Sequence, residues 1–207
     1  MDLQRNDAWF LARAGKATAS SIYKVMARTK TGWGADRANY MAQLVSERLT
    51  GRPADSFSNS AMQWGIDTEP QARAMYELET GNGVVECGFF DHPEIAMTGA
   101  SPDGLIGLDG LIEIKCPNTA THIATLRGAE IEGKYIKHMQ WQMACTGTAW
   151  CDFVSFDPRL PDEMQMHVCR VERDDGMIAD IAAHVTEFLA EVDEAIADLT
   201  TRYRKAA

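Results

Sequence analysis

The chain has 207 residues, 45% of them hydrophobic, and a formal net charge of −10. This length and hydrophobic content favour a single domain over residues 1–207 with a sizeable core, and the acidic balance argues against a general nucleic-acid binder with a basic footprint. No stretch approaches the roughly 20 apolar residues of a membrane helix, and the N-terminus has no signal-peptide pattern. We therefore expect a cytoplasmic protein without a membrane partner.

Helices are predicted for the first part of the chain. Thr18 and Ser20 are good N-cap residues, and apolar residues follow them at helical spacing, so a short helix is expected there, ending in a polar loop at 28–34. The next helix is predicted over 35–49. The stretch 52–60 is rich in Ser, Asp and Pro and is predicted to be a linker.

A third helix is predicted over 61–79, and Pro70 lies inside it. Either Pro70 occupies the first turn of a helix capped by Thr68, or it kinks a longer helix. The sequence leaves both alternatives open. The Gly- and Asn-containing run at 80–83 is expected to end the helix.

The middle of the chain changes to a strand pattern. Strands are predicted over 84–90, 94–98, 105–108, 111–116, 150–156 and 165–171. Asp109-Gly110 predicts a two-residue hairpin turn between the third and fourth of these strands. A helix is predicted over 135–145, and apolar residues from Ile178 to Leu199 recur at helical spacing to predict a long final helix. This order predicts a mixed α/β domain.

The strand predicted over 111–116 contains candidate catalytic residues. Side chains alternate along a strand, so Glu113 and Lys115 share one face, while Ile112 and Ile114 point to the other. Hydrolysis of a phosphodiester needs charge neutralisation and an activated water, and carboxylates that hold Mg²⁺ meet both needs. The pattern indicates a metal ligand beside a cation. The alternative is a solvated surface salt bridge.

Asp103 precedes Glu113 by ten residues and offers a second carboxylate. A strict two-residue hairpin, however, places Asp103 opposite Cys116, which is the wrong parity for Glu113. A one-residue bulge near Gly104 or Gly107 would correct this, because glycines are common at bulges.

An ordered set of motifs resembles the lambda exonuclease (YqaJ-type viral recombinase) family. The motifs are Gly65-x-x-x-Glu69-Pro70-x-Ala72, Ser101-Pro102-Asp103-Gly104, Glu113-Ile114-Lys115-Cys116-Pro117 and Gln140-x-Gln142. The Asp-Gly and Glu-x-Lys pair is also typical of the broader PD-(D/E)xK nucleases. The resemblance therefore implies a restriction-endonuclease-like core, in which a central mixed β-sheet is flanked by helices.

The resemblance also implies a metal site. It makes Asp103, Glu113 and the backbone carbonyl of Ile114 ligands of Mg²⁺, with two ions expected and Mn²⁺ able to substitute. Lys115 would position and activate the attacking water. Two further residues are implied to be catalytic, namely Glu69 as an accessory acid and Gln140 as the residue that completes the site.

Contacts to DNA follow from the same resemblance. Arg13 and the helix start at Thr18, Ala19 and Ser20 are similar to a pocket for the 5′-phosphate of a DNA end. Free N–H groups at a helix start and an arginine both favour a phosphate, although an ordinary helix cap is the alternative reading of the Thr and Ser residues.

Four more residues are expected to contact DNA, and they are Arg28, Lys30, Lys137 and Met62. Lys137 stands where lambda exonuclease has a tyrosine. The histidines at 92, 122 and 138 show no ligand spacing and are predicted to have structural or surface roles.

The activity implied by the resemblance is 5′-to-3′ exonucleolytic digestion of double-stranded DNA ends, which releases 5′-mononucleotides and leaves a 3′ overhang. A homotrimeric ring and a single-strand annealing partner are implied with it. Residues 1–60 carry nine Lys or Arg and five Asp or Glu, a net +4, whereas residues 61–207 carry eleven and twenty-five, a net −14. This distribution is compatible with a ring whose channel alone is positive. The alternatives are a related endonuclease or resolvase, and a catalytically inactive DNA-binding protein.

Overall fold

The computed structural model describes residues 3–30, 32–54 and 59–203, so the predicted linker lies partly outside the described residues. The helices are α1 (Asp7–Arg13), η1 (Ala19–Ser21, 3-10), α2 (Ile22–Val25), α3 (Ala35–Thr50), α4 (Ser60–Thr80), α5 (Thr119–Leu126), α6 (Gly133–Thr146), η2 (Asp162–Met164, 3-10) and α7 (Asp175–Tyr203). The strands are β1 (Ala17–Thr18), β2 (Arg28–Thr29), β3 (Gly32–Trp33), β4 (Val84–Val85), β5 (Phe90–Asp91), β6 (Thr98–Ala100), β7 (Gly104–Ile106), β8 (Gly110–Lys115), β9 (Trp150–Phe156) and β10 (Met166–Glu172). Among these helices, none is both long and apolar enough to cross a membrane.

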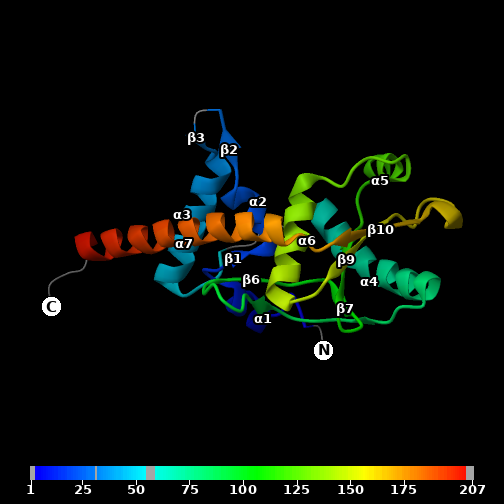
Figure 1. Cartoon of the computed structure of the whole chain (residues 1–207), viewed down its shortest axis with the longest axis horizontal. Helices are drawn as coiled ribbons and strands as arrows, with labels where there is room; N and C mark the ends of the chain where they lie inside the picture. Colours follow the sequence, from blue (N-terminus) through cyan, green and yellow to red (C-terminus); the bar gives the residue numbers. More distant parts are fainter. Residues whose placement is uncertain (1–2, 31, 55–58, 204–207) are drawn as a thin grey trace.

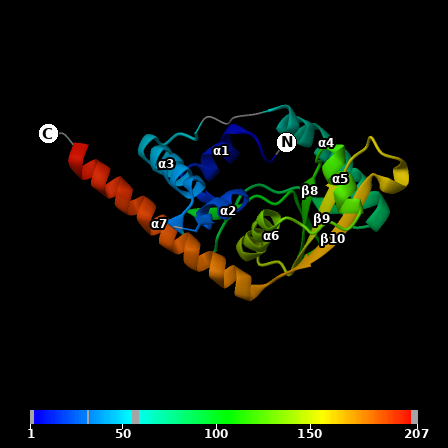
Figure 2. The same cartoon turned by 90° about the horizontal axis from the view of Figure 1, so that it is seen from above.

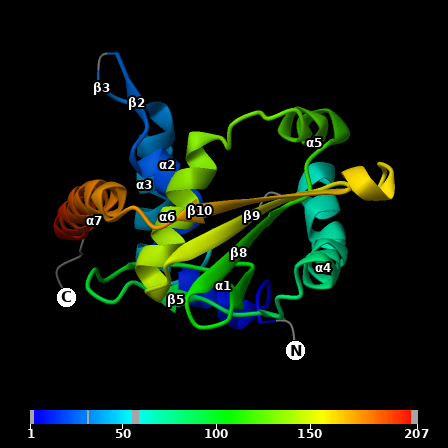
Figure 3. The same cartoon turned by 45° about the vertical axis from the view of Figure 1, so that its right-hand side comes forward.

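A five-stranded mixed sheet forms the centre of the molecule. Its order is β10-β9-β8-β7-β4, with β8 and β9 parallel and the other neighbours antiparallel. Figure 3 shows α6 on one face of this sheet and α4 on the other. Leu111 of β8 lies in one apolar cluster with Met139 of α6. Ile112 and Ile114 lie in another with Tyr76 of α4. The predicted mixed α/β fold, with a central sheet flanked by helices, is confirmed.

The alternating side chains of β8 therefore face two different helices. The apolar residues at 112 and 114 anchor the strand on α4, so Glu113 and Lys115 point to the side of α6. β9 pairs with β8 over its whole length and β7 pairs with residues 110–112, so the backbone of β8 is held by the sheet. The candidate acid and amine are thus mounted on a rigid element.

A second core lies at the other end of the molecule, where α7 runs past α2 and α3 before extending away from the body (Figures 1 and 2). Arg37 of α3 is buried and links these helices. Its guanidinium donates to both carboxylate oxygens of Glu191 in α7, at 2.9 Å for the Nη2–Oε1 bond, and to the carbonyl of Val25 in α2 at 3.1 Å. The basic N-terminal third is thereby attached to the acidic C-terminal helix.

The β7–β8 hairpin differs from the predicted two-residue turn. Its loop is the three residues 107–109, and Gly107 takes the left-handed conformation at φ +60°, which glycine adopts readily because it has no Cβ. The observed register pairs Gly104 with Ile112. Continued by one residue, it places Asp103 opposite Glu113. The parity problem is thus resolved by the loop length, and the two-residue turn prediction is wrong.

Most of the long elements agree with their predictions. The helices predicted over 35–49 and 135–145 and the final helix correspond to α3, α6 and α7, and the strands predicted over 111–116, 150–156 and 165–171 correspond to β8, β9 and β10. The strands predicted over 84–90 and 94–98 are wrong in extent, because only short pieces of this stretch pair with neighbours. Helices α1 and α5 and the β2–β3 hairpin were not predicted from the sequence.

Pro70 lies inside one continuous helix. The side chain of Asn59 caps the first turn of α4, and the helix then runs without a break past Thr68 and Pro70. Of the two alternatives, the longer helix is therefore correct. Because proline has no N–H, the carbonyl of Ile66 lacks its usual donor four residues later.

The short helix predicted after Thr18 is reduced to η1 followed by the single turn of α2. Thr18 makes no side-chain cap; its N–H donates to the Tyr40 hydroxyl at 3.0 Å, and its hydroxyl lies 3.3 Å from that of Ser20. Thr18 stands at the N-cap position of η1, but its side chain caps nothing, because strand pairing and Tyr40 hold its backbone; Ser20 lies inside η1, so the prediction of two side-chain caps is wrong.

A three-stranded sheet of order β1-β6-β5 supports this N-terminal region, with β1 parallel to β6. Gly99 of β6 lies where neighbouring atoms leave no room for a side chain. A Cβ atom at Gly99 would lie 2.3 Å from the carbonyl oxygen of Phe90 and 2.4 Å from the ring of Phe89. Since backbone cannot move aside as a long side chain can, only glycine fits here.

We predict that Gly99→Ala lowers the free energy of unfolding by about 1–3 kcal/mol through overpacking. Urea denaturation of the wild type and the variant measures this change. Gly83→Ala is the matched control, because a Cβ atom there meets nothing within 4 Å. Equal stabilities of the two alanine variants would show that β5 can shift to admit the methyl group.

Candidate active site

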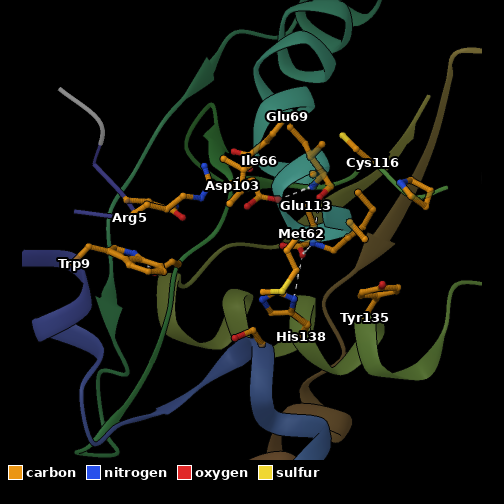
Figure 4. A pocket seen from close by; sticks show the side chains of 18 of the residues that line it. Arg5, Trp9, Met62, Ile66, Glu69, Asp103, Glu113, Cys116, Tyr135 and His138 are labelled. Carbon is orange, nitrogen blue, oxygen red and sulfur yellow. Dashed lines mark hydrogen bonds and ion pairs between the residues drawn. The ribbon is translucent and has the colours of Figure 1, made fainter. Parts of the chain in front are cut away.

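A cleft of about 610 Å³ opens between the carboxyl end of β8, the helices α4 and α6, and the N-terminal segment. Figure 4 shows its side chains converging from these elements. Asp103, Glu113 and Lys115 all line it, together with the backbone position Ile114 and with Glu69. The structure therefore brings together the acids and the amine that the sequence singled out.

Glu113 is the most buried of these groups, at 1% exposure. One carboxylate oxygen forms an ion pair with Lys115 and lies 3.1 Å from Nδ1 of His138 in α6. The other oxygen accepts a hydrogen bond of 2.7 Å from Nε2 of Gln142. A strand and a helix thus fix both oxygens of this carboxylate.

Asp103 lies beside Glu113 at the end of the partner strand. Its Oδ2 accepts a hydrogen bond of 2.7 Å from the N–H of Ile114. The carbonyl of Ile114 accepts one of 3.1 Å from Nζ of Lys115. Two carboxylates, a carbonyl oxygen and an ammonium group consequently share one small region.

Burial and neighbouring charges shift the pKa values of Asp103, Glu113 and Lys115. Burial and the charge of Glu113 raise the pKa of Asp103 to about 8. Burial also acts to raise the pKa of Glu113, but His138 and Lys115 outweigh it and hold that pKa well below its usual range. Burial acts to lower the pKa of Lys115, but the charges of Glu113 and Asp103 raise it above its usual value. A second negative charge here is unfavourable without more positive charge.

This donor set fits a hard divalent cation, which prefers oxygen ligands. A cation between Asp103 and Glu113 would stabilise both as carboxylates. In the part of the chain that the structure describes, no group of three or more His, Cys, Asp or Glu side chains could hold a metal. The backbone carbonyl of Ile114 is a further oxygen beside these two carboxylates.

Glu69 reaches the same cleft from α4 but is already paired. One of its oxygens forms an ion pair with Arg5, and the other accepts a hydrogen bond of 2.8 Å from Arg73. Arg5 was not identified from the sequence, because it belongs to no recognisable motif. As placed here, Glu69 faces two guanidinium groups.

Gln140 does not reach the cleft. Its amide donates to the carbonyl of Glu172 at 2.8 Å and accepts from the N–H of Asp174 at 2.8 Å, so it holds the connection from β10 to α7. The expectation that Gln140 completes the site is therefore corrected. Gln142, the other member of the same motif, contacts Glu113 instead.

His138 and Tyr135 line the cleft as well, against the expectation of a structural or surface role for His138. A signal for them was present in the sequence. Tyr135, His138 and Gln142 are spaced by three and four residues, which places them on one face of a helix. Gln140 falls on another face of that helix.

Arg13 lies at the other end of the same cleft. Its guanidinium stacks 4.1 Å from the centre of the Trp9 ring, and both side chains donate to the hydroxyl of Ser101, at 3.2 and 2.9 Å. Ser20 also lines the cleft and is exposed, whereas Thr18 and Ala19 are buried. Of the four predicted phosphate contacts, Arg13 and Ser20 therefore line this cleft, and Thr18 lines a second pocket with both of them.

The remaining predicted DNA contacts lie at different distances from this cleft. Met62 lines it and is 52% exposed. Arg28 and Lys30 are exposed on the β2–β3 hairpin, where Arg28 stacks 4.0 Å from the centre of the Trp33 ring. Lys137 is half-buried on α6 and does not line the cleft.

Comparisons with known proteins identify the family and the fold. The model of the YqaJ-like viral recombinase domain matches residues 8–149. The crystal structure of the alkaline exonuclease LHK-Exo from Laribacter hongkongensis is 53% identical, with a TM-score of 0.90 over 98% of this chain and 100% of that chain. The structure of LHK-Exo in complex with dAMP is 54% identical, with a TM-score of 0.91 over the same shares of the two chains.

A more distant likeness concerns the fold alone. A phage-related exonuclease from Haemophilus somnus is 16% identical, with a TM-score of 0.68 over 92% of this chain and 99% of that chain. The comparison with curated proteins gave no match.

The two glutamines of α6 allow a test of the site as built. Gln140→Leu is predicted to lower the free energy of unfolding by about 1–3 kcal/mol, because it leaves two backbone groups unpaired. It should also expose the Asp174 amide to hydrogen exchange, which nuclear magnetic resonance can follow. Gln142→Leu is the matched control and should leave that amide protected. Unchanged protection of Asp174 in Gln140→Leu would contradict the placement of Gln140.

Proposed function

Because the chain belongs to the YqaJ-like viral recombinase family, we propose that it is a Mg²⁺-dependent exonuclease that digests one strand of a double-stranded DNA end from 5′ to 3′. It releases 5′-mononucleotides and leaves a 3′ single-stranded overhang. The observation that carries the proposal is the single cleft in which Asp103, Glu113 and Lys115 lie together with Arg13 and Ser20. The likeness to an exonuclease solved with dAMP supports a nucleotide ligand.

The carboxylates of Asp103 and Glu113 and the carbonyl of Ile114 are the proposed ligands of the first ion, and Glu69 is the acid available to a second. Mn²⁺ is expected to substitute for Mg²⁺, because both prefer oxygen ligands. A bound divalent ion supplies positive charge at the scissile phosphate and makes a nearby water more acidic.

Lys115 has the role of orienting the attacking water and stabilising charge on the phosphate. Its ammonium group is held by Glu113 and by the Ile114 carbonyl, so it is fixed beside the proposed ion without being a ligand. His138 and Gln142 position Glu113 from α6. In this role they replace Gln140.

The DNA end is proposed to bind at the Arg13 side of the cleft. Arg13 and the exposed Ser20 hydroxyl would hold the 5′-phosphate, and the backbone at Thr18 and Ala19 would form the floor of this subsite. A guanidinium recognises phosphate through paired charge-assisted hydrogen bonds. Arg13 is already oriented by Trp9 and Ser101, so little ordering remains to be done.

Further contacts and the biological setting are part of the same proposal. Met62 would contact DNA in the cleft that it lines, and Arg28, Lys30 and Lys137 would contact DNA outside it. The whole chain is proposed to act as one nuclease domain, assembled as a homotrimeric ring in the cytoplasm. It would work with a single-strand annealing protein in phage-type recombination. The family and the basic N-terminal third support this setting.

Linear and circular duplex DNA incubated with the protein and Mg²⁺ test the activity. We predict that only linear DNA disappears, with mononucleotides as product, and that Asp103→Asn reduces the rate by about 10²-fold or more through loss of an anionic ligand. Nicked or cut circles would instead favour an endonuclease or resolvase. No digestion by the wild type would favour a binding protein, and rapid digestion by Asp103→Asn would remove Asp103 from the site.

The end-binding subsite predicts a dependence on the terminal phosphate. Wild-type protein should degrade 5′-phosphorylated ends about tenfold or more faster than 5′-hydroxyl ends, since hydrogen bonds between charged groups contribute about 1.5–3 kcal/mol. Arg13→Ala should nearly erase this preference. Initial rates on both ends for both proteins form the measurement.

Arg28→Ala is the matched control for that cycle, because it removes a proposed DNA contact on the hairpin and should slow digestion of both ends equally. A wild type without preference, or an Arg13→Ala variant that keeps the full preference, would place the phosphate subsite elsewhere.

A further inference from the structure

Arg5 lies in the short segment before α1 and extends into the cleft toward the acids (Figure 4). Its neighbours are fixed on both sides. The side-chain amide of Gln4 donates to the carbonyls of Cys87 and Pro102, at 2.9 and 2.8 Å. The side chain of Asn6 caps the first turn of α1 at 2.9 Å. The position of Arg5 is therefore set by the fold.

The backbone of Arg5 is strained. Its φ of +62° lies in the left-handed region, which residues with a side chain avoid. Such strain persists only where the surroundings impose it, and it gathers at functional sites. A chain that needed only a turn here could use glycine at no such cost. The strain thus points to a use for the guanidinium.

That guanidinium is placed on Glu69. Each oxygen of the Glu69 carboxylate is paired with one guanidinium, from Arg5 on one side and from Arg73 on the other. Arg73 is 12% exposed and also pairs with Glu86 at 3.0 Å, whereas the side chain of Arg5 is 34% exposed. Arg5 is consequently the partner that can be displaced from the cleft side.

Under the function proposed above, on which this inference rests, Glu69 is the acid available to a second divalent ion. A guanidinium and a metal ion compete for the same carboxylate oxygen, because one oxygen cannot face both cations closely. We propose that Arg5 takes the place of the second cation in the DNA-free protein. Glu69 is then closed to a second ion, whereas in the described part of the chain Arg5 forms no ion pair with Asp103 or Glu113 and so does not compete with the first.

The consequence for binding is quantitative. When an ion must displace Arg5, its apparent affinity equals the intrinsic affinity multiplied by the fraction of protein in which Glu69 is free of Arg5. Removing the guanidinium should therefore strengthen the second site by about tenfold or more. The first site should be unchanged, since Arg5 makes no ion pair with Asp103 or Glu113 in the described part of the chain.

Electron paramagnetic resonance of free Mn²⁺ counts the ions bound by DNA-free protein. The main variant is Arg5→Gly, because glycine adopts the observed backbone conformation without strain and should fold as the wild type does. We expect one tight ion for the wild type and two for Arg5→Gly. Arg5→Lys keeps the charge as a matched control and is expected to bind one.

The double variant Arg5→Gly with Glu69→Gln locates the second ion, and it should return to one. Asp103→Asn reports on the first ion, which it should remove. One ion in both the wild type and Arg5→Gly, or two in both, would overturn the inference while leaving the proposed function intact. If neither protein bound Mn²⁺, both the inference and the metal site of the proposed function would be wrong.

Discussion

The buried carboxylate of Glu113 is the constraint on which the rest of the site depends. A charge at 1% exposure must be paired and hydrogen-bonded, because an isolated one would cost far more than a single domain can spare. Lys115 on the same strand and His138 and Gln142 on α6 together satisfy it. The position of α6 on the sheet therefore determines both the packing of the core and the pairing of Glu113 in the cleft. A change that moved α6 would also leave this charge unpaired.

The sequence predicted the part of the site that lies within a single strand. Alternation alone placed Glu113 and Lys115 on one face, and β8 follows it. The position of Asp103 depends on the length of the loop at 107–109. This loop has three residues and begins at the left-handed Gly107, whereas the Asp109-Gly110 pair predicted a turn of two residues. Local patterns thus determine faces, while the register between strands depends on the loop that joins them.

The residues contributed by helices were harder to assign, because a motif does not fix the phase of its helix. Gln140 and Gln142 are two positions apart and so point about 200° apart around the axis. The apolar residues of α6 that pack on the sheet decide which of them faces Glu113. Arg5 could not be found at all, since the segment that carries it is held through the side chain of Gln4 by Cys87 and Pro102, far away in sequence. Such residues become visible only once the chain has folded.

The cleft is assembled from contacts between distant parts of the chain, and this affects how it forms. Partners are separated by 29 residues for Glu113 and Gln142, by 64 for Arg5 and Glu69, and by 92 for Trp9 and Ser101. Contacts of this kind are made only after long loops have closed, which slows folding. Recovery of a working cleft should therefore lag behind the appearance of helix during refolding. A chain that has not yet emerged from the ribosome as far as His138 and Gln142 lacks the helix that pairs with Glu113, so its cleft is incomplete.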